Sequence, residues 1–311
     1  MTATIHSFEE CLPAARRLAD VLGIACRAIK LRHFPDGESL VQVAATERTA
    51  ILYRSLDHPN DKLVELLLAA SALRDRGARH VILVAPYLGY MRQDMAFRPG
   101  EAVSQKVIGR LLAAHVDGLV TVDPHLHRVA SLAEVLPGID AVAVSAAMTL
   151  ADMLRPGITP DTVLIGPDAE SRPWVESVAG PLGLPVLVGE KNRLGDRQVE
   201  LAIAGIQGVR GRPVVLVDDL ISSGATLARC AELLHAAGAA RVEAVATHCL
   251  AGPNDLAKLA AAGIARVRST DTVPSPAAAA SIAPSLVDAL ARWVPPSCAI
   301  AQESAASGDA D

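Results

Sequence analysis

The chain has 311 residues, a net charge of −5 and an apolar fraction of 51%, while aromatic residues make up only 3%. That length is enough for two domains, and the negative charge argues against a general binder of nucleic acid or of anionic membranes. The sequence has no apolar run of the ~18 residues that span a bilayer and no signal-peptide pattern, so we expect a cytoplasmic protein. Five scattered cysteines without metal-site spacing predict reduced thiols.

Short apolar, β-branched runs alternate with helix-like patterns along the chain. The expected strands are Val81–Ala85, Gly118–Val122, Val163–Gly166, Pro185–Gly189, Val214–Val217 and Val242–Thr247. The expected helices are Lys62–Arg76, Ser104–His115, Arg172–Val178, Leu227–Ala237 and Asp255–Ala262. This alternation is typical of parallel α/β sheets with ligand sites at the carboxyl ends of the strands. We expect an N-terminal domain over residues 1–143, a C-terminal domain over 144–301, and a disordered polar tail over 302–311.

The most informative segment is the run from Pro213 to Ala237. Two acids, Asp218 and Asp219, are expected to end a buried strand, and a turn of small residues then leads into a helix. Backbone N–H groups and hydroxyls at such a turn bind phosphate, while the acids are suited to accept hydrogen bonds from sugar hydroxyls. The segment therefore predicts a pentose phosphate site; the alternative is an ordinary turn with Ser and Thr as helix caps. The turn residues are Ser222, Ser223, Gly224, Ala225 and Thr226.

Two motifs in the first half of the chain are suited to bind a nucleotide. The aromatic ring and two carboxylates of the run Phe34-Pro35-Asp36-Gly37-Glu38 can hold adenine and ribose, although Pro-Asp-Gly is also a common hairpin turn. In the run Arg92-Gln93-Asp94, the guanidinium offers a fork for phosphate and the amide can read a base edge. Its alternative is a solvated loop.

Two further motifs are suited to hold a divalent ion at strand ends. Asp123-Pro124-His125 follows the expected strand at Gly118–Val122, where carboxylate and imidazole can bind the ion directly or through water. Its alternative is a half-buried structural histidine, and we expect His127 to be structural. Asp168 follows the strand at Val163–Gly166 and is either a metal or sugar ligand or a charge that favours the next helix.

Lys191 and Arg193 are expected in a loop after the strand at Pro185–Gly189, together with Gly195. Two cations in such a loop suit a mobile lid that closes over polyphosphate and excludes water. The alternative is a pair of surface charges.

In this order the six motifs FPDGE, RQD, DPH, GPD, KNR and VDDLISSGAT resemble the ribose-phosphate diphosphokinase family, also called phosphoribosyl-pyrophosphate synthetases, from about Phe34 to Val273. The resemblance implies two type I phosphoribosyltransferase-like α/β domains with parallel sheets, related by a pseudo-twofold axis. It implies transfer of the β,γ-diphosphate of ATP to the 1-hydroxyl of ribose 5-phosphate, with Mg²⁺. It also implies a dimer or hexamer whose ATP site crosses a subunit interface.

The resemblance assigns roles to matching residues. The implied ATP contacts are Phe34, Asp36, Gly37, Glu38, Arg92, Gln93 and Asp94, and the implied metal ligands are His125 and Asp168. Lys191 and Arg193 match the catalytic lid cations. The implied ribose 5-phosphate contacts are Arg193, Asp218, Asp219, Ser222, Ser223, Gly224, Ala225 and Thr226.

The sequence departs from the family pattern at a few positions. Met95 stands where many members have a basic residue, and Pro124 replaces a bulky aliphatic residue. Ser222, Ser223 and Ala225 replace the usual residues of the phosphate turn. Two other functions stay open: a phosphoribosyltransferase, which has no need of an adenine site, and a non-catalytic homologue that regulates a true synthetase.

Overall fold

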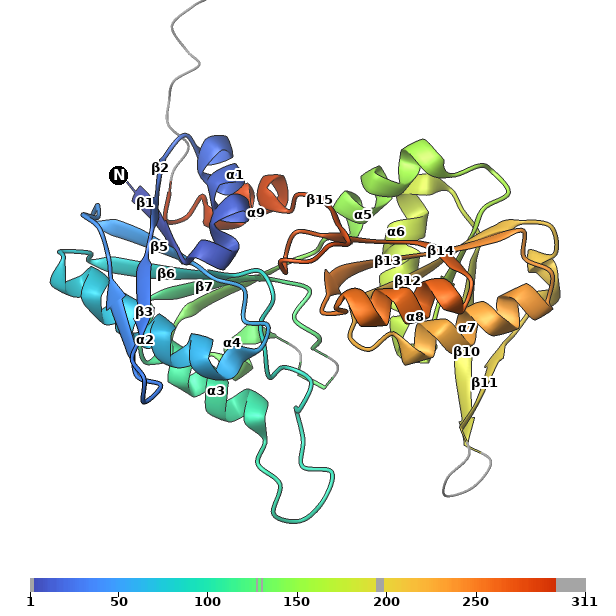
Figure 1. Ribbon diagram of the computed structural model, residues 1–311, viewed down its shortest axis with the longest axis horizontal. Helices are drawn as coiled ribbons and strands as arrows, with labels where there is room; N and C mark the ends of the chain where they lie inside the picture. The colour runs from blue at the N-terminus through green and yellow to red at the C-terminus, as the bar shows by residue number, and fades with distance from the viewer. Residues whose placement is uncertain (1–2, 127, 130, 194–198, 295–311) are drawn as a thin grey trace, which may run out of the picture.

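The computed structural model describes residues 3–126, 128–129, 131–193 and 199–294, which form two α/β units joined side by side (Figure 1). Every strand and helix expected from the sequence is present, with ends shifted by a few residues. The expected α/β class with mostly parallel sheets is therefore confirmed. His127, Gly195 and the tail 302–311, about which the sequence made predictions, lie outside the described residues.

The first unit is a six-stranded sheet in the order β2-β1-β5-β6-β7-β8, in which all neighbours run parallel. Its strands are β1 (Ala3–Ser7), β2 (Ala25–Ala28), β5 (Thr49–Tyr53), β6 (His80–Ala85), β7 (Gly118–Val122) and β8 (Asp140–Val144). Its helices are α1 (Leu12–Leu22), α2 (Pro59–Asp75), α3 (Ser104–Ala113) and α4 (Leu132–Val135). Side chains alternate across a strand, so Leu52 of β5 packs in the core with α2 and Ile51 packs in the core with α1.

The second unit is a seven-stranded sheet in the order β11-β10-β9-β12-β13-β14-β15, in which only the pair β10 and β11 is antiparallel. Its strands are β9 (Val163–Gly166), β10 (Val186–Arg193), β11 (Val199–Ile203), β12 (Pro213–Ile221), β13 (Arg241–Cys249), β14 (Ile264–Thr270) and β15 (Ala278–Ala280). Helices cover both faces: α5 (Ala147–Leu154) and α6 (Arg172–Ala179) share one core, α7 (Ala225–Ala236) and α8 (Pro253–Ala261) the other.

The last described helix, α9 (Ala283–Leu290), belongs structurally to the first unit. It packs against α1, and its Leu286 and Leu290 are fully buried in the core that α1 covers. The first unit is thus completed by a helix from the far end of the chain. We call the contact between the units, where the carboxyl ends of β7 and β13 meet, the seam.

Two predictions about strand ends are wrong. Asp218 and Asp219 do not end their strand, because Leu220 and Ile221 continue β12 and pair with β13. The segment Glu190–Arg193, expected as a loop, lies within β10, since after Val188 this strand leaves β9 and pairs with β11 instead. In both places the run of apolar residues ends, but the backbone hydrogen bonds to the neighbouring strand continue through the polar residues that follow.

The run Phe34–Glu38 forms the turn of an antiparallel hairpin between β3 (Lys30–His33) and β4 (Ser39–Gln42). The Phe34 N–H donates to the Glu38 carbonyl at 2.8 Å, and the Gly37 N–H donates to the Phe34 carbonyl at 2.9 Å. Gly37 has φ +93°, which side-chain-bearing residues rarely adopt. Pro35-Asp36-Gly37 therefore forms a hairpin turn, the alternative that the sequence offered for this run.

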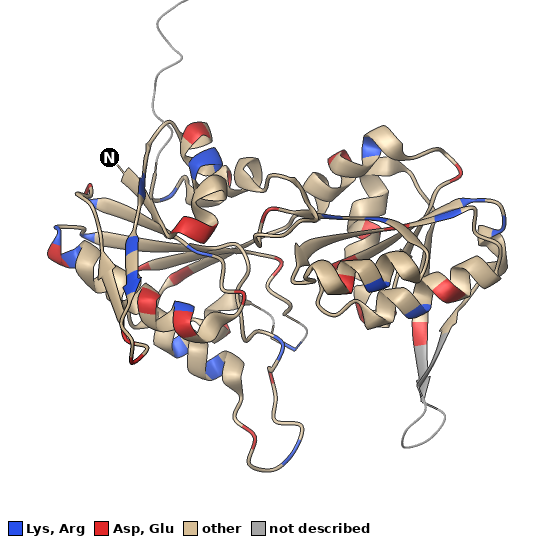
Figure 2. Cartoon of the chain, in the orientation of Figure 1, with Lys and Arg blue, Asp and Glu red and all other residues tan. Residues whose placement is uncertain are grey.

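Acidic and basic residues are interspersed over both units (Figure 2). Cys11, Cys26, Cys230 and Cys249, the cysteines in the described ranges, form no disulfide bonds with one another. Among the helices that the structure describes, none is both long and apolar enough to cross a membrane.

Candidate active site

The phosphate loop, residues 222–226, connects β12 to the N-terminus of α7. Gly224 precedes the helix with φ +74°, and a Cβ at this position would lie 2.7 Å from Leu259 Cδ2. Both backbone conformation and packing therefore require glycine. No described side chain caps the first turn of α7, so the alternative of a Ser or Thr helix cap is not realised. The N–H groups of that turn are available to an anion.

Asp218 and Asp219 form a half-buried acid pair beside the loop. The Asp219 N–H donates to Asp218 Oδ1 at 3.0 Å. Burial, reinforced by the charge of Asp219, raises the pKa of Asp218 well above its usual range. Burial also opposes the charge of Asp219, but the His125 imidazole outweighs it and lowers the pKa of that carboxyl. One acid of the pair is thus favoured as protonated and the other as charged.

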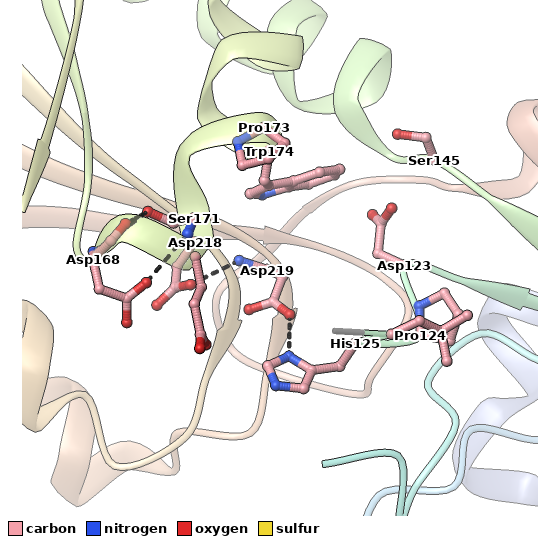
Figure 3. Close-up of a pocket in the computed structure, with 12 residues that line it drawn as sticks. Asp123, Pro124, His125, Ser145, Asp168, Ser171, Pro173, Trp174, Asp218 and Asp219 are labelled. Carbon is pink, nitrogen blue, oxygen red and sulfur yellow. Dashed lines mark hydrogen bonds and ion pairs between the residues drawn. The ribbon is translucent and has the colours of Figure 1, made fainter. Parts of the chain in front are cut away.

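His125 reaches this pair from the first unit across the seam. Its Nδ1 lies 2.6 Å from Asp219 Oδ2, and the two side chains face each other (Figure 3). Since a carboxylate only accepts hydrogen bonds, Nδ1 carries the proton. The seam therefore joins a histidine of one unit to an acid of the other.

The Asp123-Pro124-His125 turn has a strained backbone. Asp123 and His125 have φ +37° and +41°, in the left-handed region that residues with side chains rarely occupy. The His125 N–H donates to the Asp123 carbonyl at 2.9 Å, which closes a three-residue turn centred on Pro124. Proline suits the central position because that position donates no hydrogen bond within the turn. The departure from the family pattern at Pro124 is thereby accommodated.

Asp123, whose carboxylate the sequence offered as a possible ligand of a divalent ion, lies half-buried at the seam. Its Oδ2 accepts hydrogen bonds from the Ala146 N–H at 3.1 Å and from Thr247 Oγ1 at 2.9 Å. Burial raises the pKa of this carboxyl to about 7, against the lowering effect of those two bonds.

Two adjoining cavities open at the seam. The larger, about 540 Å³, is lined from both units, and the smaller, about 280 Å³, is lined by the phosphate loop and Arg92. The residues common to both linings are His125, Asp168, Glu170, Asp218 and Asp219 (Figure 3). The expected metal ligands, the acid pair and the phosphate loop thus lie around two adjoining cavities that share part of their walls.

Asp168 fills one of its two expected roles in the described structure. Its Oδ1 accepts the Ser171 N–H at 3.2 Å and caps a short 3₁₀ helix at Ala169–Ser171, which realises the helix-start alternative. The residue also lines both cavities, so it remains a candidate ligand.

In the Arg92-Gln93-Asp94 run, the first residue lines a cavity and the other two bond to neighbouring side chains. Arg92 lines the smaller cavity beside the phosphate loop. Gln93 Oε1 accepts from Ser104 Oγ at 2.7 Å, and Arg128 Nη1 donates to both carboxylate oxygens of Asp94 at 2.8 and 3.1 Å. Their contacts to ATP stay predictions.

The hairpin turn Phe34–Glu38 is not brought to the seam cavities within this chain. Gly37 and Glu38 line a separate open cavity of about 650 Å³, together with α2 residues that include Val64 and Leu68. None of the residues that line it also lines either seam cavity in the described part of the chain.

Lys191 and Arg193 lie in β10, in register with Leu201 and Val199 of β11. β10 and β12 flank β9, so the base of this hairpin is roughly 10 Å from the strand that carries the phosphate loop.

Sequence reasoning missed several residues around the larger cavity. Ser145, Glu170 and Trp174 all contribute to its lining. Trp174 had a usable signal, because the chain has only 2 tryptophans and this one closely follows Asp168. Thr247 and His248 had a weaker one, a polar pair at the end of an apolar strand.

The donor set of the seam fits a hard divalent cation. No group of three His, Cys, Asp or Glu side chains within the described ranges could hold a metal by itself. Mg²⁺ does not need such a cage, because it keeps several waters and binds through one or two carboxylates and substrate phosphates. Asp219, whose pKa is lowered beside the raised pKa of Asp218, provides negative charge that such a cation would neutralise.

A phosphate loop at a helix N-terminus, a preceding acid pair and a hairpin beside a parallel sheet define a phosphoribosyltransferase-type α/β site. A family model described as the N-terminal domain of ribose phosphate pyrophosphokinase matches residues 3–115, and a phosphoribosyl transferase domain model matches residues 140–276. The chain therefore belongs to the ribose-phosphate pyrophosphokinase family, as its relatives also show.

Two similar proteins are named as ribose-phosphate pyrophosphokinases. A ribose-phosphate pyrophosphokinase of Methanopyrus kandleri is 37% identical over 284 residues, covering 90% of this chain and 96% of the relative. Ribose-phosphate pyrophosphokinase 2 of Archaeoglobus fulgidus is 37% identical over 259 residues, covering 83% and 89%. The crystal structure of phosphoribosylpyrophosphate synthetase from Mycobacterium smegmatis superposes with a TM-score of 0.78 at 26% identity, covering 92% of this chain and 97% of that one.

Proposed function

We propose that this chain transfers the β,γ-diphosphate of ATP to the 1-hydroxyl of ribose 5-phosphate, giving 5-phospho-α-D-ribose 1-diphosphate and AMP. Family membership supports the reaction. The observation that carries it is the pair of adjoining cavities at the seam, where the phosphate loop, the acid pair and His125 meet. We further propose that the protein is cytoplasmic.

The sugar phosphate binds at the second unit in this proposal. Its 5-phosphate accepts hydrogen bonds from the N–H groups of residues 222–226 at the start of α7. The charged Asp219 accepts from the ribose diol, and the protonated Asp218 can donate or accept. This arrangement directs the 1-hydroxyl toward the larger cavity.

The diphosphate lies in the larger cavity with charge supplied from both units. In-line attack on the β-phosphorus depends mainly on positioning and charge neutralisation, so a strong general base is not needed. Arg92 approaches from the first unit. Lys191 and Arg193 approach from the β10–β11 hairpin, whose closure over the cavity would exclude water.

His125 and Asp168 would hold Mg²⁺ in this proposal, because both line the two cavities next to the acid pair. When bound, the ion would supply positive charge that neutralises the negative charge developing on the phosphates during transfer. The protein's own part is to fix these two ligands from opposite sides of the seam.

The adenine site requires a second copy of the chain. The turn Phe34–Glu38, with its implied adenosine contacts Phe34, Asp36, Gly37 and Glu38, lies apart from the seam cavities of its own chain. Beside it, Leu40, Val64 and Leu68 are 45%, 57% and 41% exposed. We therefore assign this apolar face to self-association in a dimer or hexamer, through which one copy presents its hairpin to another.

One assay separates the possible functions. The purified chain is incubated with ATP, Mg²⁺ and ribose 5-phosphate, and AMP and the diphosphorylated sugar are followed by phosphorus NMR. Stoichiometric formation of both supports the proposal, and a parallel sample without Mg²⁺ should form neither. Nucleotide formation only after a base and the diphosphorylated sugar are supplied would indicate a phosphoribosyltransferase. No reaction in either mixture would indicate a non-catalytic homologue.

A further inference from the structure

We propose that Thr247 and His248, at the carboxyl end of β13, are positioning residues that hold the Asp123-Pro124-His125 turn across the seam. In this way they set the place of the His125 imidazole above the acid pair. The inference rests on the proposed function only in taking His125 as a site residue. Neither residue touches the substrates in this proposal, so both act through the turn.

The two side chains bind the turn at neighbouring points. Thr247 Oγ1 donates to Asp123 Oδ2 at 2.9 Å, and His248 Nε2 lies 3.1 Å from the Val122 carbonyl oxygen. Thr247 and His248 are 0% and 2% exposed, so water does not compete for these bonds. The second sheet thus fixes both the last residue of β7 and the first residue of the turn.

The protonation of His248 follows from its partners. Nε2 faces a carbonyl oxygen, which only accepts, so Nε2 carries the proton. Nδ1 then accepts from Thr272 Oγ1, which is 2.8 Å away. The Thr272 hydroxyl also lies 2.9 Å from the Thr247 carbonyl oxygen, but that oxygen has a second donor in Thr270 Oγ1 at 2.7 Å, which leaves the Thr272 proton for His248. The ring also meets the Tyr87 ring edge-on, with centroids 4.9 Å apart. Two hydrogen bonds and one ring contact therefore fix the orientation of a neutral His248 imidazole in a single tautomer.

The turn needs such support because its backbone is strained. Asp123 and His125 both have positive φ, a conformation that persists in residues with side chains only when the surroundings impose it. The Asp123 carboxylate connects the supports, since Oδ2 accepts from both Thr247 and the Ala146 N–H. Loss of the Thr247 hydroxyl should let the turn relax and displace His125, two residues further along.

The test compares variants that differ by one hydroxyl. Thr247→Val removes the donor and keeps the shape, and Thr247→Ser restores the donor. Thr121→Val is the matched control, because Thr121 is a fully buried strand residue of β7 whose hydroxyl has no partner among the described residues. Amide hydrogen exchange of peptides covering residues 119–126 and 142–149 is measured on the full-length protein, together with kcat and the KM for ribose 5-phosphate.

We expect Thr247→Val to exchange about tenfold faster at His125 and Ala146, whose amides bond to Asp123. Its kcat should fall roughly 10-fold to 100-fold while the KM for ribose 5-phosphate stays unchanged, since the phosphate loop is not disturbed. Thr247→Ser should restore both, and Thr121→Val should change neither. If Thr247→Val does not fold, Thr272→Val, which removes the donor to His248, carries the same expectation for exchange.

Unchanged exchange in Thr247→Val, equal effects in Thr121→Val, or no rescue by Thr247→Ser would overturn the inference. These readings of exchange do not depend on turnover. Absence of AMP formation by the unmodified protein would instead refute the proposed function, so the two failures are distinguishable.

Discussion

Substituting alanine for Gly224 adds a methyl group where the phosphate loop meets α8. The residue has φ +74°, and a non-glycine residue in this region loses about 1–2 kcal/mol. The new Cβ would lie 2.7, 2.9 and 3.0 Å from Leu259 Cδ2, Cδ1 and Cγ. Leu259 is 1% exposed and cannot turn into solvent, so overpacking adds about 1–3 kcal/mol. We expect a total loss of about 2–5 kcal/mol in the free energy of unfolding.

Gly183→Ala provides the matched control. Gly183 has φ +66°, and none of the described atoms lies within 4 Å of the point that the alanine methyl group would occupy. It therefore carries the backbone strain without the clash, and the effect of alanine on the unfolded chain is common to both variants.

Urea unfolding gives both free energies, and calorimetric titration gives the affinity for ribose 5-phosphate. Gly224→Ala should be the less stable by about 1–3 kcal/mol and should bind the sugar phosphate more weakly, because the loop amides move. Gly183→Ala should bind it normally. Equal losses of stability in the two variants would refute the close packing of the loop against Leu259.

Lys191→Ala should lower AMP formation by about 10²–10³-fold, by analogy with loss of a donor that stabilises transition-state charge, with unchanged affinity for ribose 5-phosphate; normal turnover would remove Lys191 from the mechanism. Val64→Glu should reduce the oligomer to smaller species in analytical ultracentrifugation, because it charges a side chain that is 57% exposed beside the hairpin; an unchanged sedimentation profile would exclude this face from self-association. Burial first, and then Arg27, lowers the pKa of His6 from 6.5 to about 4, so the unfolded chain binds a proton that the folded chain rejects between these values. This part of the stability is therefore present above pH 6.5 and lost as the pH falls toward 4. His6→Leu removes it, and its stability relative to the unmodified protein should rise by about 2 kcal/mol from pH 7.5 to pH 5; a constant difference in urea unfolding would contradict the burial of a neutral imidazole.

The sequence predicted those parts of the fold that depend on local pattern. The apolar strands and periodic helices stand where expected, and the phosphate loop is recognisable because its glycine, hydroxyls and preceding acids are contiguous. Strand ends were less predictable. β10 continues through Lys191 and Arg193 because β11 pairs with it, and that pairing leaves no apolar signal in the polar run.

The site was predictable to the extent that its residues lie in short motifs. Asp168, His125 and the acid pair each follow a strand, and the sheets bring them to one space. The contact of Thr247 with Asp123 joins residues 124 positions apart, and only the packing of the two units creates it. The place of the Phe34–Glu38 turn could not be predicted for a similar reason, since its proposed partner lies on another copy.

The central claim is that one space at the seam binds the sugar phosphate and the nucleotide together. A crystal structure with ribose 5-phosphate, Mg²⁺ and a non-hydrolysable ATP analogue tests it most directly. We predict the 5-phosphate at the amides of residues 222–226, the ion between His125 and Asp168, and the analogue's phosphates in the larger cavity. Clear density for either substrate at a different surface, with the seam cavities filled only by solvent, would contradict the account.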